Sequence, residues 1–178
     1  MFSSTYKLKD AAVLVPVFRG RNKELRIILI RRSLHGVHSG QLAFPGGQVE
    51  KTDISLEHTA LREGEEEIGL KSSNVKILTG LPEVEVRASN FRIKPFLAHI
   101  KPQDKWIIQE SEVSEVIDVS LQDLARPESH QEEMLRLEEW PEARRIAFYK
   151  VGPYKLWGAS YRIFNPLLPR LLNGEFPI

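Results

Sequence analysis

Three glutamates at helical spacing, downstream of a pair of glycines, are the side chains of this sequence best placed to do chemistry. Glu63, Glu66 and Glu67 stand at positions i, i+3 and i+4 of a segment that follows Gly46 and Gly47. On a helix these side chains share one face, where like charges repel by roughly a few tenths of a kcal/mol per pair. A hard divalent cation prefers oxygen ligands and would turn this repulsion into attraction. The spacing therefore predicts a site for Mg²⁺ or Mn²⁺.

A glutamate-rich helix is more often a solvated surface face, so the rest of the pattern has to decide. Arg62, Glu63, Glu66, Glu67 and Gly69 are identities at fixed spacing. At roughly one in fifteen for each residue, they coincide by chance on the order of once in 10^6 windows. We therefore interpret the segment as a binding site.

The run from Gly47 to Leu70 resembles the signature of the Nudix hydrolases. That signature reads glycine, five residues, glutamate, seven residues, then Arg-Glu-apolar-x-Glu-Glu-x-Gly-apolar. The sequence departs from it at three places: Asp53 replaces the first glutamate, one extra residue precedes Arg62, and Gly64 replaces an apolar residue. None of these departures removes a carboxylate from the cluster.

This resemblance implies an α/β fold, an α/β/α sandwich with a mixed β-sheet, and a diphosphate hydrolase that uses Mg²⁺ or Mn²⁺. It makes the three glutamates metal ligands, one of which could also orient or deprotonate the attacking water; the sequence does not say which one. It gives Arg62 a structural role, bracing the loop through Asp53. Direct contact between Arg62 and a phosphate is the alternative.

A further acidic residue after the motif often completes such sites in the family. Glu83, Glu112 and Glu115 are the candidates, each of them otherwise an ordinary surface charge. We prefer Glu112, because it precedes a predicted strand as the corresponding segment of the family does. His35 and His38 are expected to be loop residues rather than ligands, although either could meet a phosphate.

Two segments upstream of the glutamates, Ile28–Ser33 and Gly40–Gly47, are similar to an extra motif of the coenzyme A diphosphatase branch of this family. Glu112–Leu121 and Leu156–Ala159 also resemble that branch, so the similarity extends over most of the chain.

The part between the two upstream segments does not match the branch. It is one residue short, and Gly36 or Val37 stands where the branch has an arginine. A missing cation would weaken binding of a phosphate by about 1.5 to 3 kcal/mol. Arg31 or Arg32 could take its place.

The expected activity is cleavage of the diphosphate bond of a nucleoside diphosphate derivative. Coenzyme A or acyl-CoA is the preferred substrate, giving phosphopantetheine and adenosine 3′,5′-bisphosphate. ADP-ribose or another nucleotide sugar is the alternative substrate, and a non-catalytic module that binds a nucleotide is the alternative class. The expected substrate-binding residues are Arg31, Arg32, Gly46 and Gly47.

Length and composition limit the classes of protein further. With 178 residues, the chain can bury one core, so we expect a single domain over residues 1–178. The net charge of +1 gives no strong positive potential that would attract a nucleic acid. The absence of cysteine excludes disulfides and thiolate nucleophiles and is compatible with the cytoplasm. We expect a cytoplasmic protein without membrane spans or a signal peptide, and a homodimer by default.

The predicted elements place the motif between a buried hairpin and a helix. Ala11–Phe18 and Leu25–Ile30 are apolar and β-branched, which indicates strands buried on both faces. Ser33–Phe44 is expected to be a loop, ending at a tight turn of proline and glycines. A helix over Leu56–Ile68 should begin at Ser55 as N-cap and stop at Gly69 in a left-handed conformation.

Two residues break the pattern of this helix. Glu57 falls inside the apolar side and is expected to be exposed at the first turn, whereas Thr59 is placed on the polar side. Gly64 should cost about 1 kcal/mol against alanine, which indicates either a tolerated weakness or another backbone packed close to it; we prefer close packing.

The remaining prediction covers the second half of the chain. A turn is expected at Ser89–Asn90, and a strand resumes at Ile146. The other predicted elements are strands over Val75–Leu78, Phe91–Ile100 and Glu115–Val119, an acidic surface helix over Gln131–Trp140, and a helix over Ala159–Leu172 that is kinked or begins again at Pro166.

Overall fold

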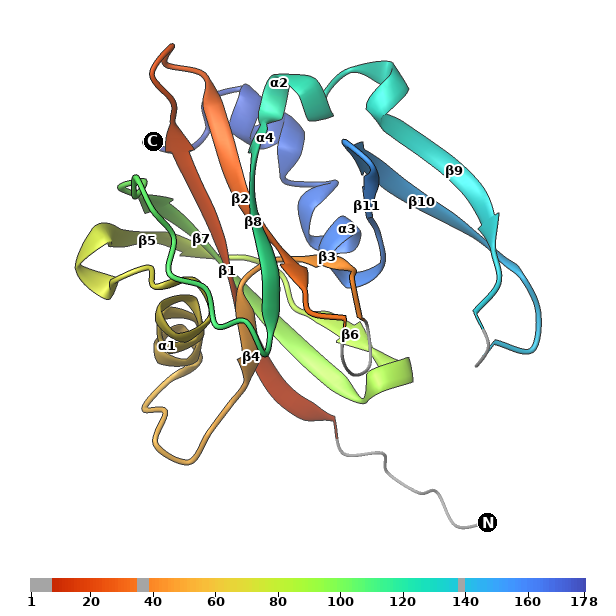
Figure 1. The fold of residues 1–178 in the computed structure, drawn as a ribbon, viewed down its shortest axis with the longest axis horizontal. Coiled ribbons are helices and arrows are strands. Elements are labelled where there is room, and N and C mark those ends of the chain that lie inside the picture. Colours follow the sequence, from red (N-terminus) through yellow and green to blue (C-terminus); the bar gives the residue numbers. More distant parts are fainter. Residues whose placement is uncertain (1–7, 35–38, 138–139) are drawn as a thin grey trace.

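The structure, a computed structural model, describes residues 8–34, 39–137 and 140–178, and its strands form two sheets (Figure 1). The larger sheet is mixed, because β1 runs parallel to β7 and the other pairings are antiparallel. Its strands are β1 (Lys9–Arg19), β2 (Leu25–Arg32), β3 (Leu42–Ala43), β4 (Gly46–Gln48), β5 (Val75–Gly80), β6 (Val84–Val86), β7 (Phe91–Ile100) and β8 (Val113–Ser120). The smaller antiparallel sheet consists of β9 (His130–Leu135), β10 (Arg144–Val151) and β11 (Tyr154–Leu156).

The two central strands, β1 and β2, carry the core on both of their faces, as predicted. Successive side chains of a strand point to opposite faces, so each strand feeds two clusters. Val15 and Leu29 belong to one buried cluster, and Leu14 and Ile28 belong to the other; all four side chains are 0 to 1% exposed. The sheet is therefore the middle layer of the molecule.

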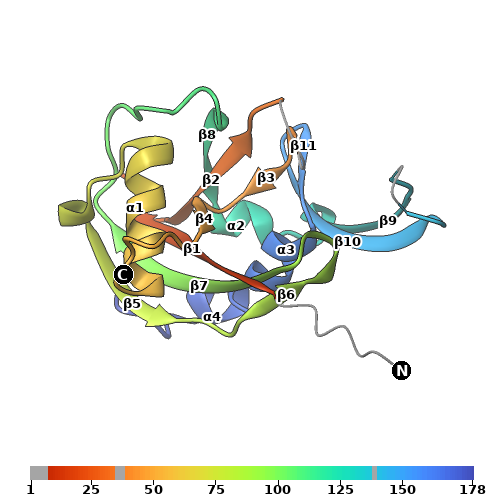
Figure 2. The ribbon, with the colours of Figure 1, turned by 90° about the horizontal axis from the view of Figure 1, so that it is seen from below.

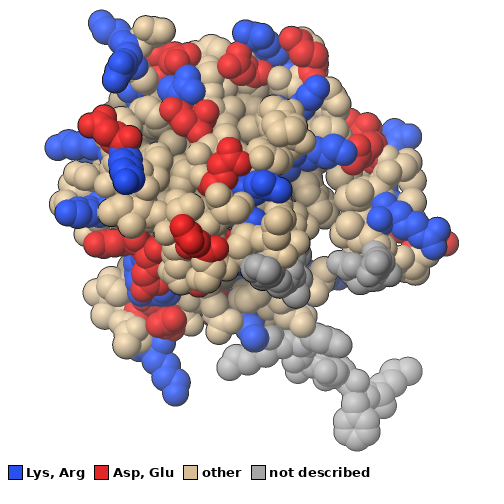
Figure 3. Space-filling view, in the orientation of Figure 1, with Lys and Arg blue, Asp and Glu red and all other residues tan. Residues whose placement is uncertain are grey.

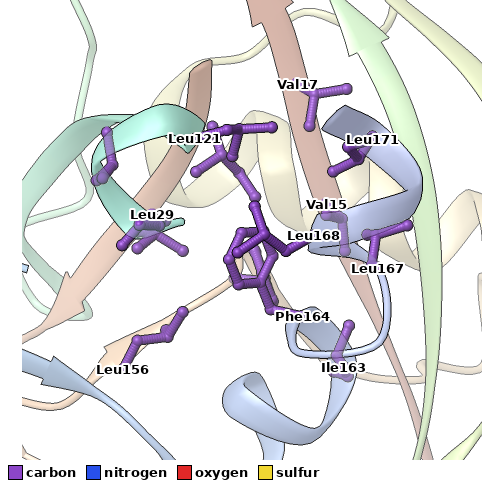
Figure 4. Close-up of a cluster of buried hydrophobic side chains, with 14 of the residues drawn as sticks. Val15, Val17, Leu29, Leu121, Leu156, Ile163, Phe164, Leu167, Leu168 and Leu171 are labelled. Atoms are coloured by element: carbon purple, nitrogen blue, oxygen red, sulfur yellow. The ribbon is translucent and has the colours of Figure 1, made fainter. Parts of the chain in front are cut away.

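Different elements cover the two faces (Figure 2). One face packs against α1 (Leu56–Ile68). The other packs against α2 (Leu121–Leu124), α3 (Gly158–Phe164), α4 (Leu168–Leu172) and the smaller sheet. Figure 4 shows Phe164 surrounded by side chains from β1, β2 and α4 in this second layer. The predicted fold class, an α/β/α sandwich with a mixed sheet, is confirmed.

Helix α1 has the ends that its sequence predicts. The Ser55 hydroxyl accepts a hydrogen bond from the His58 N–H at 3.0 Å, and the Gly69 N–H donates to the Glu65 carbonyl at 2.9 Å. Gly69 has a φ of 68°, the left-handed conformation that favours glycine. Glu57 is exposed, as expected.

Two details of α1 differ from the prediction. Thr59 is fully buried rather than on the polar side, because its hydroxyl donates to Asp53 Oδ2 at 2.9 Å and so loses no hydrogen bond on burial. Among the described residues, no backbone of another element packs close to Gly64: a Cβ atom there would meet only Leu14 Cδ2, at 3.5 Å, which is ordinary van der Waals contact. The glycine is therefore not required by space.

The acidic helix predicted over Gln131–Trp140 is wrong. Residues His130–Leu135 form strand β9, which pairs with β10 in the register Glu133 to Ile146. The backbone of β10 offers this segment a complete row of hydrogen bonds, and this tertiary pairing overrides the helical preference of its glutamates. Residues 138–139 lie outside the described part.

The other predicted elements are confirmed, with boundaries that shift by a few residues. The turn at Asn90 has a φ of 57°, and the last predicted helix is divided into α3 and α4 on either side of Pro166. The predicted loop Ser33–Phe44 contains the short strand β3, which pairs with β2. Strands β4, β6 and β11 and helix α2 were missed, because three or four residues are too few to show a period.

The surface carries both signs of charge. On the face seen in Figure 3, acidic and basic side chains are interspersed rather than gathered into one field. None of the described helices is both long and apolar enough to cross a membrane.

Candidate active site

Glu67 is the buried centre of the glutamate cluster. Its residue is 1% exposed, and its Oε2 accepts a hydrogen bond of 2.9 Å from the N–H of Gly46 on β4. Burial raises the pKa of Glu67 from 4.5 to about 8. The Gly46 N–H and Arg32 oppose this rise, whereas the negative charges of Glu63 and Glu112 add to it. A carboxylate held in this way is costly to ionise unless a cation is near.

Glu63 lies one helical turn before Glu67 and is half-buried. Burial is the main cause that raises the pKa of Glu63; Arg62 lowers it, and Glu66 and Glu112 raise it further. The side chain lies directly against Gly47, where an added Cβ atom would be 2.6 Å from Glu63 Cδ. Gly47 therefore lacks a side chain because the carboxylate fills that space.

Gly46 is constrained by its own strand pairing. A Cβ atom at Gly46 would lie 2.6 Å from the Cα atom of Val13 and would also collide with the carbonyl oxygen of Ala12. Gly46 pairs with Val13 across β1 and β4. The two glycines thus bring the backbone of β4 against β1 on one side and against the glutamates of α1 on the other.

Arg62 and Asp53 form the pair that the family resemblance implies. The Arg62 Nε and Nη2 atoms donate to the two Asp53 oxygens at 2.9 and 3.0 Å, and Nη2 also donates to the Gln48 carbonyl at 3.2 Å. Asp53 has a fully buried side chain. The Arg62 guanidinium holds the pKa of Asp53 well below its ordinary value, with help from the Glu50 N–H and other donors. Arg62 thereby joins β4, the loop and α1.

The remaining nitrogen of Arg62 reaches two of the glutamates. Nη1 lies 2.8 Å from Glu66 Oε2 and 3.0 Å from Glu63 Oε1. The Glu66 side chain is 52% exposed, so this ion pair is weak and easily exchanged. If these two contacts were lost, the hydrogen bonds to Asp53 and Gln48 would still hold Arg62 in place.

Glu112 is the one among the three later acidic candidates whose charge acts on the cluster. It is exposed, and it raises the pKa of both Glu63 and Glu67. The Gln109 N–H donates to the Glu67 carbonyl at 3.0 Å, which ties this segment to the end of α1. In contrast, the charge of Glu83 raises the pKa of Arg92, and Glu115 accepts a hydrogen bond from Tyr154.

Arg31 and Arg32 do not act together. They are consecutive residues of β2, so their side chains point to opposite faces of the sheet. Arg32 lies on the face of α1 and lowers the pKa of Glu67. Arg31 lies on the other face, with its guanidinium 4.8 Å from the centre of the Tyr154 ring. The sequence could not separate the two, because the strand end was not predicted beyond Ile30.

The donor set fits a hard divalent cation, although its side chains do not yet surround a common point. Among the described residues, no three acidic or histidine side chains are close enough to share a metal ion. Glu63 and Glu66 lean toward Arg62 instead. The donors are all carboxylates, and burial, with a smaller contribution from neighbouring negative charges, raises the pKa of Glu63 and Glu67.

Several supporting residues were not identified from the sequence. His58 Nδ1 lies 2.9 Å from Asp53 Oδ1, and Thr59 contacts the other oxygen. Their only signal was their position in the first turn of the helix that follows Asp53. The histidines His35 and His38, and the positions Gly36 and Val37 where an arginine was missing, lie outside the described residues.

Comparison with known proteins gives a family. A model of the NUDIX domain matches residues 8–140. A protein of Salmonella paratyphi B, "Uncharacterized Nudix hydrolase NudL", is 33% identical over 169 residues, which cover 94% of this chain and 85% of that protein. A protein of the same name from Salmonella typhi matches equally.

Solved structures share the fold at lower identity. An Ap4A hydrolase of C. elegans has a TM-score of 0.54 at 20% identity, over 65% of this chain and 82% of that chain. A MutT/nudix family protein from Enterococcus faecalis has a TM-score of 0.58 at 18% identity, over 97% of this chain and 65% of that chain. The NUDIX domain of Shewanella oneidensis NrtR, complexed with ADP ribose, has a TM-score of 0.51 at 21% identity, over 65% of this chain and 75% of that chain. At these identities the likeness concerns the fold alone.

Proposed function

Since the chain belongs to the NUDIX family and is a hydrolase of nucleoside diphosphate derivatives, we propose that its substrate is coenzyme A or an acyl-CoA. The products would be phosphopantetheine and adenosine 3′,5′-bisphosphate. The observation that carries the hydrolytic site is the buried Glu67 carboxylate, held by the Gly46 N–H and surrounded by the charges of Glu63, Glu112 and Arg32.

Nudix hydrolases generally need divalent metal ions, and Mg²⁺ or Mn²⁺ suits an all-oxygen donor set. Glu63, Glu66 and Glu67 would hold the ion, with Glu112 as the further carboxylate. When bound, such an ion polarises a phosphoryl oxygen and lowers the pKa of a water molecule. Glu63 and Glu66 would have to leave Arg62, which stays in place through Asp53 and Gln48.

The other residues of the site would bind and orient the diphosphate. Arg32 lies on the face of α1 and supplies a positive charge near Glu67. Gly46 and Gly47 would contribute through the glutamates, because the Gly46 N–H holds Glu67 and the missing side chain of Gly47 leaves room for Glu63. Arg62 acts by holding the loop rather than by touching phosphate, since Asp53 engages it from both oxygens.

The choice of coenzyme A rests on the segments Ile28–Ser33 and Gly40–Gly47, which are similar to the motif of that branch. The lack of an arginine at Gly36 or Val37 favours the alternative, ADP-ribose or another nucleotide sugar. A catalytically inactive nucleotide-binding module remains the alternative class. The intact set of carboxylates speaks for an enzyme.

A substrate panel tests this proposal. Purified protein with Mg²⁺ or Mn²⁺ is assayed on coenzyme A, ADP-ribose, NADH and diadenosine polyphosphates. Phosphopantetheine is the diagnostic product of coenzyme A cleavage. Coenzyme A should have the highest kcat/KM. Preference for ADP-ribose would replace the proposed substrate, and no turnover of any compound would point to the binding module.

The glutamate assignment is tested by substitution. Glu67→Gln keeps the shape of the side chain and removes its charge, so kcat should fall by about 100-fold or more, as for other groups that stabilise transition-state charge. Glu65→Gln is the matched control, because Glu65 is exposed on the same helix and away from the cluster. Full activity of Glu67→Gln would contradict the assignment.

We also propose that residues 1–178 form one domain. The support is a buried cluster in which Val15 and Leu29 of the larger sheet pack with Leu156 of the smaller sheet and with Phe164 and Leu168 of the last two helices.

A further inference from the structure

The segment between β7 and β8, residues 101–112, lies along α1 and is docked on the end of that helix (Figures 1 and 2). The last carbonyl groups of a helix have no partner within the helix itself. Here the Glu67 carbonyl accepts a hydrogen bond from the Gln109 N–H at 3.0 Å. The next two carbonyls along the chain accept hydrogen bonds from the Ile107 N–H at 3.3 Å and from the Gln103 side chain at 3.1 Å. The end of α1 thereby fixes the course of this segment.

The far end of the segment is a closed turn that carries Glu112. The Gln109 carbonyl accepts hydrogen bonds from the N–H groups of Glu112 and Val113, both at 2.9 Å. Ser33, a buried residue that follows β2, ties the same turn to the sheet. Its N–H donates to the Glu112 carbonyl and its hydroxyl donates to the Ser111 carbonyl, each at 2.8 Å. The backbone of Glu112 is therefore held between the end of α1 and the end of β2.

Gln109 also holds the side chain of Glu112. Its Nε2 atom donates to Glu112 Oε1 at 3.1 Å and lies 3.4 Å from the Ser111 hydroxyl. Among the described side chains, no other donates a hydrogen bond to the Glu112 carboxylate. An exposed glutamate is otherwise free to change rotamer, and ordering it costs conformational entropy. The amide of Gln109 therefore restricts where this carboxylate can lie.

One residue thus connects the two parts of the carboxylate cluster. The backbone of Gln109 is bonded to Glu67, and its side chain is bonded to Glu112, whose charge acts on Glu63 and Glu67. We propose that Gln109 is a positioning residue for the cation site, which holds the Glu112 carboxylate beside the glutamates of α1. This inference rests on the proposed function, because it takes Glu112 as part of that site. A ligand that is ordered in advance loses less freedom on binding, so the amide should strengthen cation binding.

Mn²⁺ alone is the probe, so the test needs no substrate. The dissociation constant of Mn²⁺ from the full-length protein is measured by electron paramagnetic resonance of the free ion. Gln109→Met keeps the length of the side chain and the backbone N–H, and it removes the amide. This variant should bind Mn²⁺ about three- to tenfold more weakly, the size of one hydrogen bond.

A double-mutant cycle separates positioning from a general effect on the fold. Glu112→Ala should itself weaken Mn²⁺ binding. If Gln109 acts through Glu112, adding Gln109→Met to Glu112→Ala should weaken Mn²⁺ binding no further.

Gln131→Met is the matched control. Gln131 is also exposed, and its amide also donates to a residue three positions away, the Glu128 carbonyl, at 2.7 Å. It lies on β9, which belongs to the smaller sheet. The control should bind Mn²⁺ as the wild type does, and thermal denaturation confirms that each variant is folded.

Three results would overturn the inference and leave the hydrolytic function standing. They are unchanged Mn²⁺ binding in Gln109→Met, unchanged Mn²⁺ binding in Glu112→Ala, and an equal loss from Gln109→Met with and without the Glu112 carboxylate. A wild-type protein that binds no Mn²⁺ would instead contradict the proposed metal site, and the role of Gln109 would fall with it.

Discussion

The competition for the free end of Arg62 is the central feature at the scale of the residue. Asp53 and Gln48 fix the guanidinium, and its last nitrogen attracts Glu63 and Glu66. A divalent cation carries twice the charge of Arg62 and suits carboxylate oxygens better, so it can take both glutamates while the arginine keeps its place. The arginine thus offsets part of the charge of the two glutamates, through contacts that an ion could replace.

The raised pKa of Glu67 makes a prediction about pH in metal-free protein. The unfolded chain releases this proton near 4.5, and the folded chain releases it only near 8. Between these values the folded state binds more protons, so the free energy of unfolding should fall as the pH rises. In Glu67→Gln this titration is absent, and the curve should be flatter.

Urea denaturation at pH 5, 6, 7 and 8 in the presence of a chelator measures both curves. The wild-type protein should lose stability relative to Glu67→Gln at each step. Parallel curves for the two proteins would show that Glu67 titrates normally and is not held in a desolvated site.

Helix α1 is the element that positions the site, and both of its ends are set by local chemistry. Ser55 caps the start, and Gly69 ends the helix in a left-handed conformation. Between them, Gly64 weakens the helix without being required, since an added methyl group would meet only Leu14 at 3.5 Å. The helix therefore carries a removable weakness on the side that packs against β1.

Gly64→Ala should stabilise the protein by up to about 1 kcal/mol, because alanine has the higher helix propensity and restricts the unfolded chain. Chemical denaturation measures the change. Gly47→Ala is the contrasting variant: its Cβ atom would lie 2.6 Å from Glu63 Cδ, so activity should fall even if the fold survives. A destabilised Gly64→Ala would show that the contact with Leu14 is tighter than ordinary packing.

At the scale of the whole molecule, the part beyond the matched family region completes the core. The family match ends at residue 140, but Leu156, Phe164 and Leu168 are at most 5% exposed and belong to the same cluster as Val15 and Leu29. Without them, one face of the central sheet would meet water. The layers on the two faces thus come from different halves of the chain.

A chain cut after Trp140 should not fold stably, because it loses the elements β10, β11, α3 and α4 that cover this face. Circular dichroism and size-exclusion chromatography of the truncated protein measure the outcome. The full chain should unfold in one cooperative transition. A truncated protein with native-like thermal unfolding would show that the family region is an independent domain.

Much of the fold could be predicted because its signals are local. Residues a few positions apart predict the strands β1 and β2, the helix α1 with both caps, and the break at Pro166. The signals are the spacing of apolar residues, the capping residues and the turn residues. Strand β9 could not be predicted, since its backbone partners lie in β10 and its own residues favour a helix. Long-range pairing is invisible to a local pattern.

The sequence by itself determined the set of glutamates and their family, because one helix fixes their spacing. Only the tertiary structure decided that Glu67 is buried, that Glu112 rather than Glu83 or Glu115 lies near the cluster, and that Arg31 and Arg32 serve opposite faces. These properties depend on which segments pack together and on where a strand ends. They follow from burial and from contacts between residues far apart in the chain, and spacing along the chain does not encode either.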